Sequence, residues 1–259
     1  MNHRTIDDSP QSFYGANQSP ITKSFIPIYL GLVPCVVAQK KQRELAVDRF
    51  TGIVPDILLL LQHPHVFTLG RFRGEKDLTV SLESLAQEGI SLVHTDRGGS
   101  ITYHGPGQLV GYPIINLKES ALNVREYVWS LEEVVLRLLT EYGIRGRRNA
   151  NLPGVWIGDQ KICSIGIHVE HFITTHGFAF NVNTDLSYFD KINPCGLHGN
   201  VMTSLSVILG SQMKVESVIE PLIESFSQIF GLIRRGVLDD WIPSATRMVK
   251  IEPYKFRYA

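Results

Sequence analysis

Apolar residues in the first half of the chain fall into short runs, with a charged segment ahead of them. Residues 56–62 (DILLLLQ) are a short apolar run, which predicts a buried strand. The runs at 66–70 (VFTLG) and 91–95 (SLVHT) predict two further strands, with a short helix near 81–87 between them. Residues 38–50 (AQKKQRELAVDRF) predict a charged helix. The first half is therefore expected to mix strands with helices.

The second half contains two long helical patterns with recognisable ends. Asn123 is followed three residues later by Glu126, the spacing of a capping box, and Gly143 ends the helix. A second helix is predicted over 215–230 and ends at Gly231. The residues expected to face the core from these helices are Val124, Val128, Leu131, Val135, Leu138 and Tyr142, and Val215, Val218, Ile219, Leu222, Ile223, Phe226 and Phe230.

Strand-like segments lie on both sides of the first long helix. Residues 108–116 precede it, and residues 155–169 form two β-rich runs joined by the turn Gly158-Asp159. A further strand is predicted at 176–183. Because hairpins replace regular βαβ units here, the chain is predicted to be α+β, with a mixed β-sheet flanked by helices.

No linker or internal repeat divides the sequence, which predicts one domain over residues 25–250. Residues 1–24 are expected to form a polar, flexible tail and residues 251–259 a C-terminal tail. The longest uncharged stretch, 24–39, contains prolines and a glycine and is shorter than the roughly 20 residues of a spanning helix. We therefore expect no membrane segment.

Charge and cysteine content narrow the function classes. Lys plus Arg and Asp plus Glu number 25 each, so no overall positive field attracts nucleic acid or an anionic membrane. The three cysteines are too scattered for a disulfide scaffold and lack CxxC spacing, which indicates a reducing, cytoplasmic compartment. The pairs His63/His65 and His168/His171 lack metalloenzyme spacing, so neither a metal nor another cofactor is expected.

A glycine-rich segment at 96–108 (DRGGSITYHGPGQ) stands between predicted strands. It matches neither a dinucleotide fingerprint nor a phosphate-binding Walker loop, because no helix opens after its glycines. Such a loop pair allows close backbone approach to a ligand, with Arg97, Tyr103 and His104 around it. A tight structural hairpin explains the glycines equally well.

Cys195 and Lys161 are the candidate reactive residues. Cys195 lies in the polar turn NPCGLHG, whereas Cys35 and Cys163 lie in apolar runs and are assigned to the core. A free thiol needs a nearby cation or base to become a nucleophile, and otherwise behaves as a small apolar group. Lys161 enters an apolar strand and could supply that charge or act as an acid or base, although most lysines are simply solvated.

With these residues in place, the chain resembles the lipoyl(octanoyl) transferases, the octanoyl-[acyl-carrier-protein]:protein N-octanoyltransferases of lipoate biosynthesis. The matching blocks are LLLQHPHVFTLGR (59–71), RGGSITYHGPGQLVGYPI (97–114), GVWIGDQKICSIGIHV (154–169) with GFAFNVN (177–183), and NPCGLHGNVMTSL (193–205). That family is similar in fold to the catalytic domain of biotin and lipoate protein ligases, which agrees with the α+β prediction.

The resemblance implies a reaction. Cys195 would take an octanoyl (or lipoyl) group from acyl carrier protein as a thioester, with Lys161 lowering the thiol pKa and moving protons. The ε-amine of a lysine on a lipoyl domain would then accept the group. The implied acceptors are the lipoyl domains of 2-oxoacid dehydrogenase E2 subunits and the glycine cleavage H protein, and the implied assembly is a monomer.

The resemblance also implies an acyl-binding site. Its residues would be Arg97, Gly98, Gly99, Ser100, Ile101, Thr102, Tyr103, His104, Ser164, Ile165, Gly166, Gly177, Phe178 and Ala179. Ser100 stands where the family often has Gln, and His198 with Asn200 makes the segment after Cys195 atypical. These departures bear on the shape of the pocket and on the surroundings of the thiol.

Three other functions remain to be distinguished. An ATP-dependent lipoate-protein ligase would need no cysteine, and a non-catalytic acyl- or lipoyl-domain-binding protein would need neither Lys161 nor Cys195. A metal-dependent hydrolase has only scattered histidines in its favour. Arg71, Arg73 and Lys76 are expected to help dock the acidic carrier protein, unless they form an ordinary solvated loop.

Overall fold

The computed structural model describes residues 23–72, 77–193 and 201–235. Within these residues an eight-stranded sheet has the strand order β11-β1-β2-β6-β10-β9-β8-β7. From one edge to the other the strands are β11 (Ile233–Arg234), β1 (Ser24–Leu32), β2 (Asp56–Gln62), β6 (Gln108–Ile114), β10 (Ile173–Asn181), β9 (Gln160–Glu170), β8 (Gly154–Ile157) and β7 (Arg147–Arg148). β1 runs parallel to both β2 and β11, and the remaining pairs are antiparallel. The prediction of an α+β fold with a mixed sheet is confirmed.

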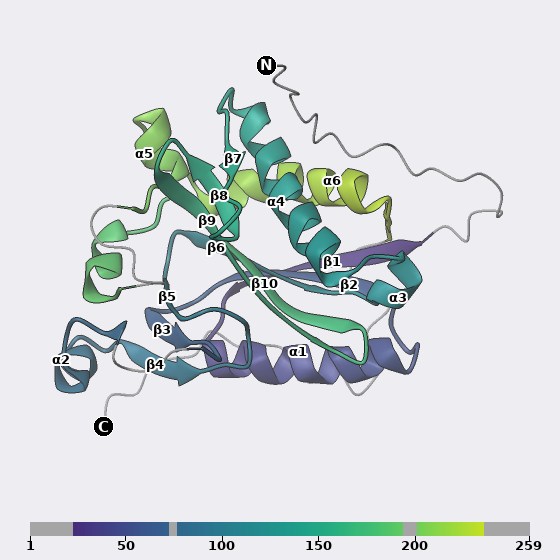
Figure 1. The fold of residues 1–259 in the computed structure, drawn as a ribbon, viewed down its shortest axis with the longest axis horizontal. Helices are drawn as coiled ribbons and strands as arrows, with labels where there is room; N and C mark the ends of the chain where they lie inside the picture. Colours follow the sequence, from purple (N-terminus) through teal and green to yellow (C-terminus); the bar gives the residue numbers. More distant parts are fainter. Residues whose placement is uncertain (1–22, 73–76, 194–200, 236–259) are drawn as a thin grey trace, which may run out of the picture.

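A second, three-stranded sheet lies against the same domain. It has the order β4 (Ser91–His94), β3 (Val66–Leu69), β5 (Ile101–His104). β3 pairs in parallel with β4 and antiparallel with β5. β5 lies inside the glycine-rich segment, which the sequence analysis treated only as loops. Figure 1 shows this small sheet on the same side of the large sheet as α1 (Cys35–Phe50).

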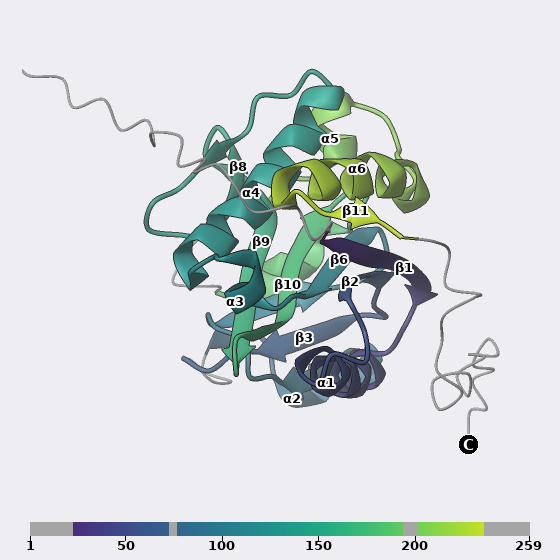
Figure 2. The same cartoon turned by 90° about the vertical axis from the view of Figure 1, so that its right-hand side faces the viewer.

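The two faces of the large sheet carry different helices (Figures 1 and 2). α1 covers one face, and α4 (Val124–Glu141) and α6 (Ile219–Phe230) cover the other. The shorter helices are α2 (Leu82–Gln87), α3 (Leu117–Ser120), α5 (Leu205–Leu209) and the 3₁₀ helices Leu186–Lys191 and Val215–Val218. None of the described helices is long and apolar enough to cross a membrane.

Local sequence explains where the long helices begin and end. Asn123 accepts from the Glu126 N–H at 2.9 Å, and the Glu126 carboxylate accepts from the Asn123 N–H at 2.8 Å, so the predicted capping box is confirmed. Gly231 ends α6 with φ 61°, a left-handed conformation that favours glycine. The buried stripe of α4 includes Tyr127 rather than Val124, which is half exposed.

Between α4, α6 and the face of the large sheet that they cover lies a continuous apolar core. Leu131, Val135 and Leu138 of α4 and Phe226 of α6 are all fully buried in it, together with Phe180 of β10. The opposite face buries a smaller apolar cluster under α1 and leaves room for a cavity between the two sheets. The cavity is the feature of the fold that matters most for function.

Candidate active site

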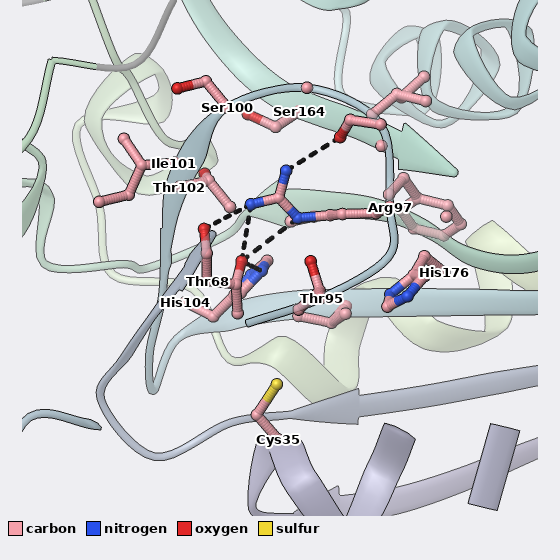
Figure 3. A pocket seen from close by; sticks show the side chains of 18 of the residues that line it. Cys35, Thr68, Thr95, Arg97, Ser100, Ile101, Thr102, His104, Ser164 and His176 are labelled. Atoms are coloured by element: carbon pink, nitrogen blue, oxygen red, sulfur yellow. Dashed lines mark hydrogen bonds between the residues drawn. The ribbon is translucent and has the colours of Figure 1, made fainter. Parts of the chain in front are cut away.

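The cavity between the two sheets gathers most of the residues predicted for acyl binding (Figure 3). It measures about 820 Å³ when the part open to solvent is included. The predicted residues in its lining are Arg97, Gly98, Gly99, Ser100, Ile101, Thr102, His104, Lys161, Ser164, Ile165, Gly166, Gly177, Phe178 and Ala179.

Small side chains form the floor of the cavity. Gly166 pairs with Gly177 and Ser164 with Ala179 across β9 and β10, so these four residues share one patch of the sheet. Because side chains alternate along a strand, Cys163 and Phe180, the next register pair, turn to the apolar core on the other face. The sheet therefore has a shallow groove on one face and tight packing on the other.

The roof of the cavity is the loop that carries Arg97, whose side chain is almost fully buried. The Arg97 guanidinium donates to the Thr68 carbonyl at 2.6 Å and to the Thr68 hydroxyl at 2.8 Å, as Figure 3 shows. The Gly98 N–H donates to the Ile167 carbonyl of β9 at 2.9 Å. These bonds join the roof to β3 on one side and to β9 on the other.

Gly166 allows this loop to lie directly on β9. A Cβ at that position would stand 3.1 Å from both the Arg97 Cδ and the Gly98 carbonyl oxygen, closer than most real contacts. A side chain at residue 166 would therefore push the roof away from the floor.

Buried polar groups connect the roof to the strand that carries Lys161. His104 contacts the Thr68 hydroxyl at 3.3 Å and the Gln108 amide oxygen at 2.7 Å. Gln108 donates to the Asn181 side chain at 2.9 Å, and Asn181 donates to the Thr203 carbonyl at 3.0 Å. Burial holds the pKa of His104 well below its ordinary value, so this imidazole is neutral. Because the neutral ring donates from Nδ1 to Gln108, its Nε2 accepts from the Thr68 hydroxyl. Each side chain from Thr68 to Asn181 therefore donates to the next one, and Asn181 donates to the Thr203 carbonyl.

Lys161 lies at one end of the cavity, on β9 and half-buried. Its N–H donates to the Val201 carbonyl at 2.6 Å, and its carbonyl accepts from the Thr203 N–H at 3.0 Å. The ammonium stands 5.3 Å from the centre of the Trp156 ring. Gly154 has φ +134°, and a Cβ there would overlap the Lys161 side chain, so glycine makes room for it.

A buried carboxylate, Glu132, interacts with the charge of Lys161. Glu132 accepts from the Gly154 N–H at 2.8 Å and forms an ion pair with Arg148 at 3.2 Å. Burial raises the pKa of Glu132, and the nearby Arg148 and Lys161 charges oppose that rise.

Cys195, His198 and Asn200 lie outside the described residues, as do Arg73 and Lys76. The residues that flank the segment containing Cys195 are described, and both are bonded to the cavity region. Asn193 donates its N–H to the Asp77 carbonyl at 2.8 Å, and the Asp77 carboxylate accepts from Ser100 of the lining at 2.5 Å. Val201, at the other end, accepts from Lys161.

Tyr103 is the predicted acyl-site residue that the structure places elsewhere. It lies between Thr102 and His104 on β5, and strand alternation directs its ring to the opposite side. There it stacks on Tyr188 at 4.7 Å, and its hydroxyl bonds His65 at 2.7 Å.

The cavity also has lining residues that the sequence analysis did not single out. They are Cys35, Thr68, Thr95, Val110, Tyr112, His176, Phe189 and Met202. Cys35 is buried, as predicted, but its sulfur faces the cavity from the first residue of α1 (Figure 3). Burial raises the pKa of this thiol to about 11, so it is protonated at neutral pH. Tyr112 lies in a block that carries the family resemblance, and the alternation of β6 was the available signal for it.

His176 is held beside the cavity in an unusual conformation. Its φ is 56°, in the left-handed region, and its N–H donates to the buried Gln42 side chain at 2.6 Å. Its ring contacts the Asp96 carboxylate at 2.6 Å. That bond holds the pKa of Asp96 well below its usual range, while burial lowers the pKa of His176. The bond to His176 therefore holds Asp96 in place, and Asp96 immediately precedes Arg97.

Two other expectations concern ions and charges. Across the ranges that the structure describes, no group of three or more His, Cys, Asp or Glu side chains is arranged to hold a metal ion. Arg71 is exposed and contacts His168 at 3.0 Å. Its role in docking a carrier protein stays a prediction.

Comparisons with known proteins agree on one family. The family model described as "Lipoyl protein ligase A/B catalytic domain" matches residues 36–227. A protein of Rubrobacter xylanophilus named octanoyltransferase is 46% identical over 203 residues, which cover 78% of this chain and 91% of that protein. An octanoyltransferase of Solibacter usitatus is 45% identical over 201 residues, covering 78% and 90% of the two chains.

The fold is shared with a more distant solved structure. The bi-partite lipoate protein ligase of Thermoplasma acidophilum, solved in a study of its lipoylation system with its E2 lipoyl domain, has a TM-score of 0.66. The match covers 86% of this chain and 89% of that one at 18% identity. At this identity the likeness establishes the fold alone.

Proposed function

Because the chain belongs to the octanoyltransferase family within the lipoyl protein ligase A/B catalytic domains, we propose that it is an acyltransferase of lipoate biosynthesis. It transfers an octanoyl group from acyl carrier protein to the ε-amine of a lysine on a lipoyl domain. The donor and the acceptor both react at the part of the cavity that Lys161 lines.

One observation supports this function above the others. Lys161 lines the cavity, and its own backbone is bonded to Val201, which follows the segment that contains Cys195. Asn193, which precedes that segment, is bonded to the roof through Asp77 and Ser100. The candidate nucleophile thus lies in a segment whose two ends are fixed next to the candidate acid and the acyl cavity.

The proposed reaction has two steps through a covalent intermediate. The Cys195 thiolate attacks the thioester carbonyl, the bond to the carrier sulfur breaks, and the Lys161 ammonium protonates the departing thiolate. The acceptor lysine amine then attacks the acyl-cysteine and gives a proton to the neutral Lys161 amine, and Cys195 leaves as a thiolate. Both catalytic groups return to their starting charge.

The small residues of the floor suit the acyl chain. Each methylene group withdrawn from water contributes about 0.8 kcal/mol, so a groove between two sheets can bind a linear chain along its whole length. Ser164, Gly166 and Ala179 leave the floor open to such a chain.

Transfer without ATP separates this function from that of a ligase. The wild type should transfer octanoyl from octanoyl-acyl carrier protein to a lipoyl domain in the absence of ATP. Lys161→Ala should lower kcat at least about a hundredfold, the usual contribution of a positioned acid or base. Lys161→Arg keeps a positive charge at this position, but its guanidinium neither releases nor takes up a proton at neutral pH, so both half-reactions should be slow.

Lys40→Ala serves as the matched control, because Lys40 is exposed on α1 and away from the cavity. Equal activity of Lys161→Ala and Lys40→Ala would refute the role of Lys161. Product that forms only with ATP and free octanoate would identify a ligase instead.

A further inference from the structure

The acyl cavity extends along the large sheet, and Tyr112 lines it far from Lys161. Gly166 and Gly177 form one register pair, and Cys163 and Phe180 another three residues along. Lys161 lies two residues further in the same direction. On the neighbouring strand, Gly111 pairs with Phe178, which puts Tyr112 level with Gly177. At about 3.4 Å per residue, Tyr112 and Lys161 are therefore separated by roughly 17 Å along the sheet.

Cys35, the first residue of α1, lines the same cavity as Tyr112. Both residues line it, and each is only 6% exposed. Burial raises the pKa of Tyr112 well above its ordinary value, and a negative charge on Cys35 would raise it further. In Figure 3 the Cys35 sulfur points up into the cavity from the start of α1, below Thr95 and Thr68. Behind Tyr112, the apolar cluster of Val33, Ile57 and Ile114 fills the space.

His63 connects the Tyr112 ring to Val33, just before the start of α1. Its ring contacts the Val33 carbonyl at 2.5 Å and the Tyr112 hydroxyl at 2.7 Å. A carbonyl can only accept, so the His63 Nδ1–H donates to Val33, and the neutral ring accepts from Tyr112. The Val33 N–H in turn donates to the Gln62 carbonyl at 2.8 Å. Val33 lies two residues before Cys35, so the start of α1 and the Tyr112 ring are braced by one fully buried imidazole.

We propose that Cys35 and Tyr112 form the end wall of the acyl cavity and set the longest acyl chain that the protein accepts. The inference rests on the proposed function, since it assumes that the chain enters with its carbonyl at the Lys161 end. The size of the side chain at position 35 can be varied by substitution, because Cys35 projects from the start of α1 as a single small side chain. Tyr112 is the fixed part, because its ring and hydroxyl are both held.

A size series at position 35 tests the wall. Transfer would be measured as kcat/KM with acyl carrier proteins loaded with C6, C8, C10 and C12 chains. Cys35→Leu should shift the preference from C8 toward C6 by about tenfold, the effect of excluding one or two methylene groups from an apolar site. Cys35→Ala should shift it in the opposite direction, raising the C10 to C8 ratio.

Cys163→Ala is the matched control, because Cys163 is a fully buried thiol on the apolar face of the same sheet. It should keep the wild-type ratio whatever it does to stability. Identical chain-length profiles in the wild type, Cys35→Ala and Cys35→Leu would overturn the proposal, and so would an equal shift in Cys163→Ala.

Binding of free C6, C8, C10 and C12 fatty acids, measured by calorimetry on the same variants, makes the wall testable without turnover. A wild type that binds C8 acid but transfers nothing would contradict the proposed function alone. A wild type that transfers octanoyl while the position 35 variants bind all lengths alike would contradict the end wall alone.

Discussion

The two faces of the large sheet are built from the same strands but do different work. On the α4 and α6 face, Phe180 and Cys163 are fully buried in an apolar cluster. On the α1 face, the alternate residues Ala179 and Ser164 are small and border a cavity. Along β9 and β10, then, one set of positions supplies stability and the other leaves space for a ligand. Activity and stability should therefore respond to different substitutions.

The largest expected effect on stability lies on the apolar face. Phe226 is fully buried and packs 4.5 Å from Phe230 and 5.0 Å from Phe25, measured between ring centres. Phe226→Ala should lower the free energy of unfolding by about 3–5 kcal/mol, through lost burial and a cavity. Denaturant unfolding measures this change, and kcat/KM of the folded protein should remain near wild type. A large loss of kcat/KM at full folding would show that the two faces are coupled.

The sequence predicted the apolar face well because its signals are local. The capping box of α4, the run of β2 and the turn at Gly158 each lie within a few residues, and each is confirmed. β1 was not predicted, because Pro27 and Gly31 interrupt it and its parallel partner β2 is distant in sequence. Only the completed sheet shows why this segment is extended.

The cavity face was predicted less completely, because its residues come together only through strand register. The resemblance pointed to Arg97, Ser164 and Ala179, which the fold brings to one cavity. Cys35 reaches the same cavity from α1, which no motif connects to it, and His176 lies immediately before the GFAFNVN block on β10. Tyr103 lies within the most specific motif but faces away, since a motif does not reveal which side of β5 its residues occupy.

The second largest expected effect is a pH dependence of stability, which arises from buried histidines on the cavity face. Burial lowers the pKa of His63 to about 4, against about 6.5 in an unfolded chain. The unfolded state therefore takes up a proton first as the pH falls. Above about pH 6.5 His63 is neutral in both the folded and the unfolded state and costs no stability. Between about pH 6.5 and pH 4 the free energy of unfolding falls by on the order of 3 kcal/mol in total. Burial lowers the pKa values of His104 and His176 too, so they act in the same direction.

Unfolding free energies between pH 7.5 and 5 check this prediction. His63→Gln should show a shallower pH dependence than wild type, because one titrating group is gone while an amide can still bond Val33 and Tyr112. His94→Gln removes an exposed histidine of β4 and serves as the control. If both variants kept the wild-type slope, the buried histidines would not be the source of acid sensitivity.

The smallest effects should come from the outer surfaces of the helices, where the two faces do not differ. Glu44 of α1 pairs with Lys41 at 3.6 Å, and Glu220 of α6 pairs with Arg234 at 2.6 Å. All four side chains are partly or largely exposed, so Glu44→Ala and Glu220→Ala should each change stability by less than about 1 kcal/mol. Thermal unfolding at low and high salt measures this. A larger loss in one variant would show that the asymmetry of the sheet extends to the surface.

Formation of a covalent acyl-enzyme tests the central claim most directly. The intact mass of the wild type would be measured after mixing with octanoyl-acyl carrier protein, without ATP and without a lipoyl domain, beside Cys195→Ala and Cys35→Ala. The account predicts a gain of one octanoyl group in the wild type and in Cys35→Ala, and no gain in Cys195→Ala. Absence of the group from the wild type, or its presence in Cys195→Ala, would contradict the account.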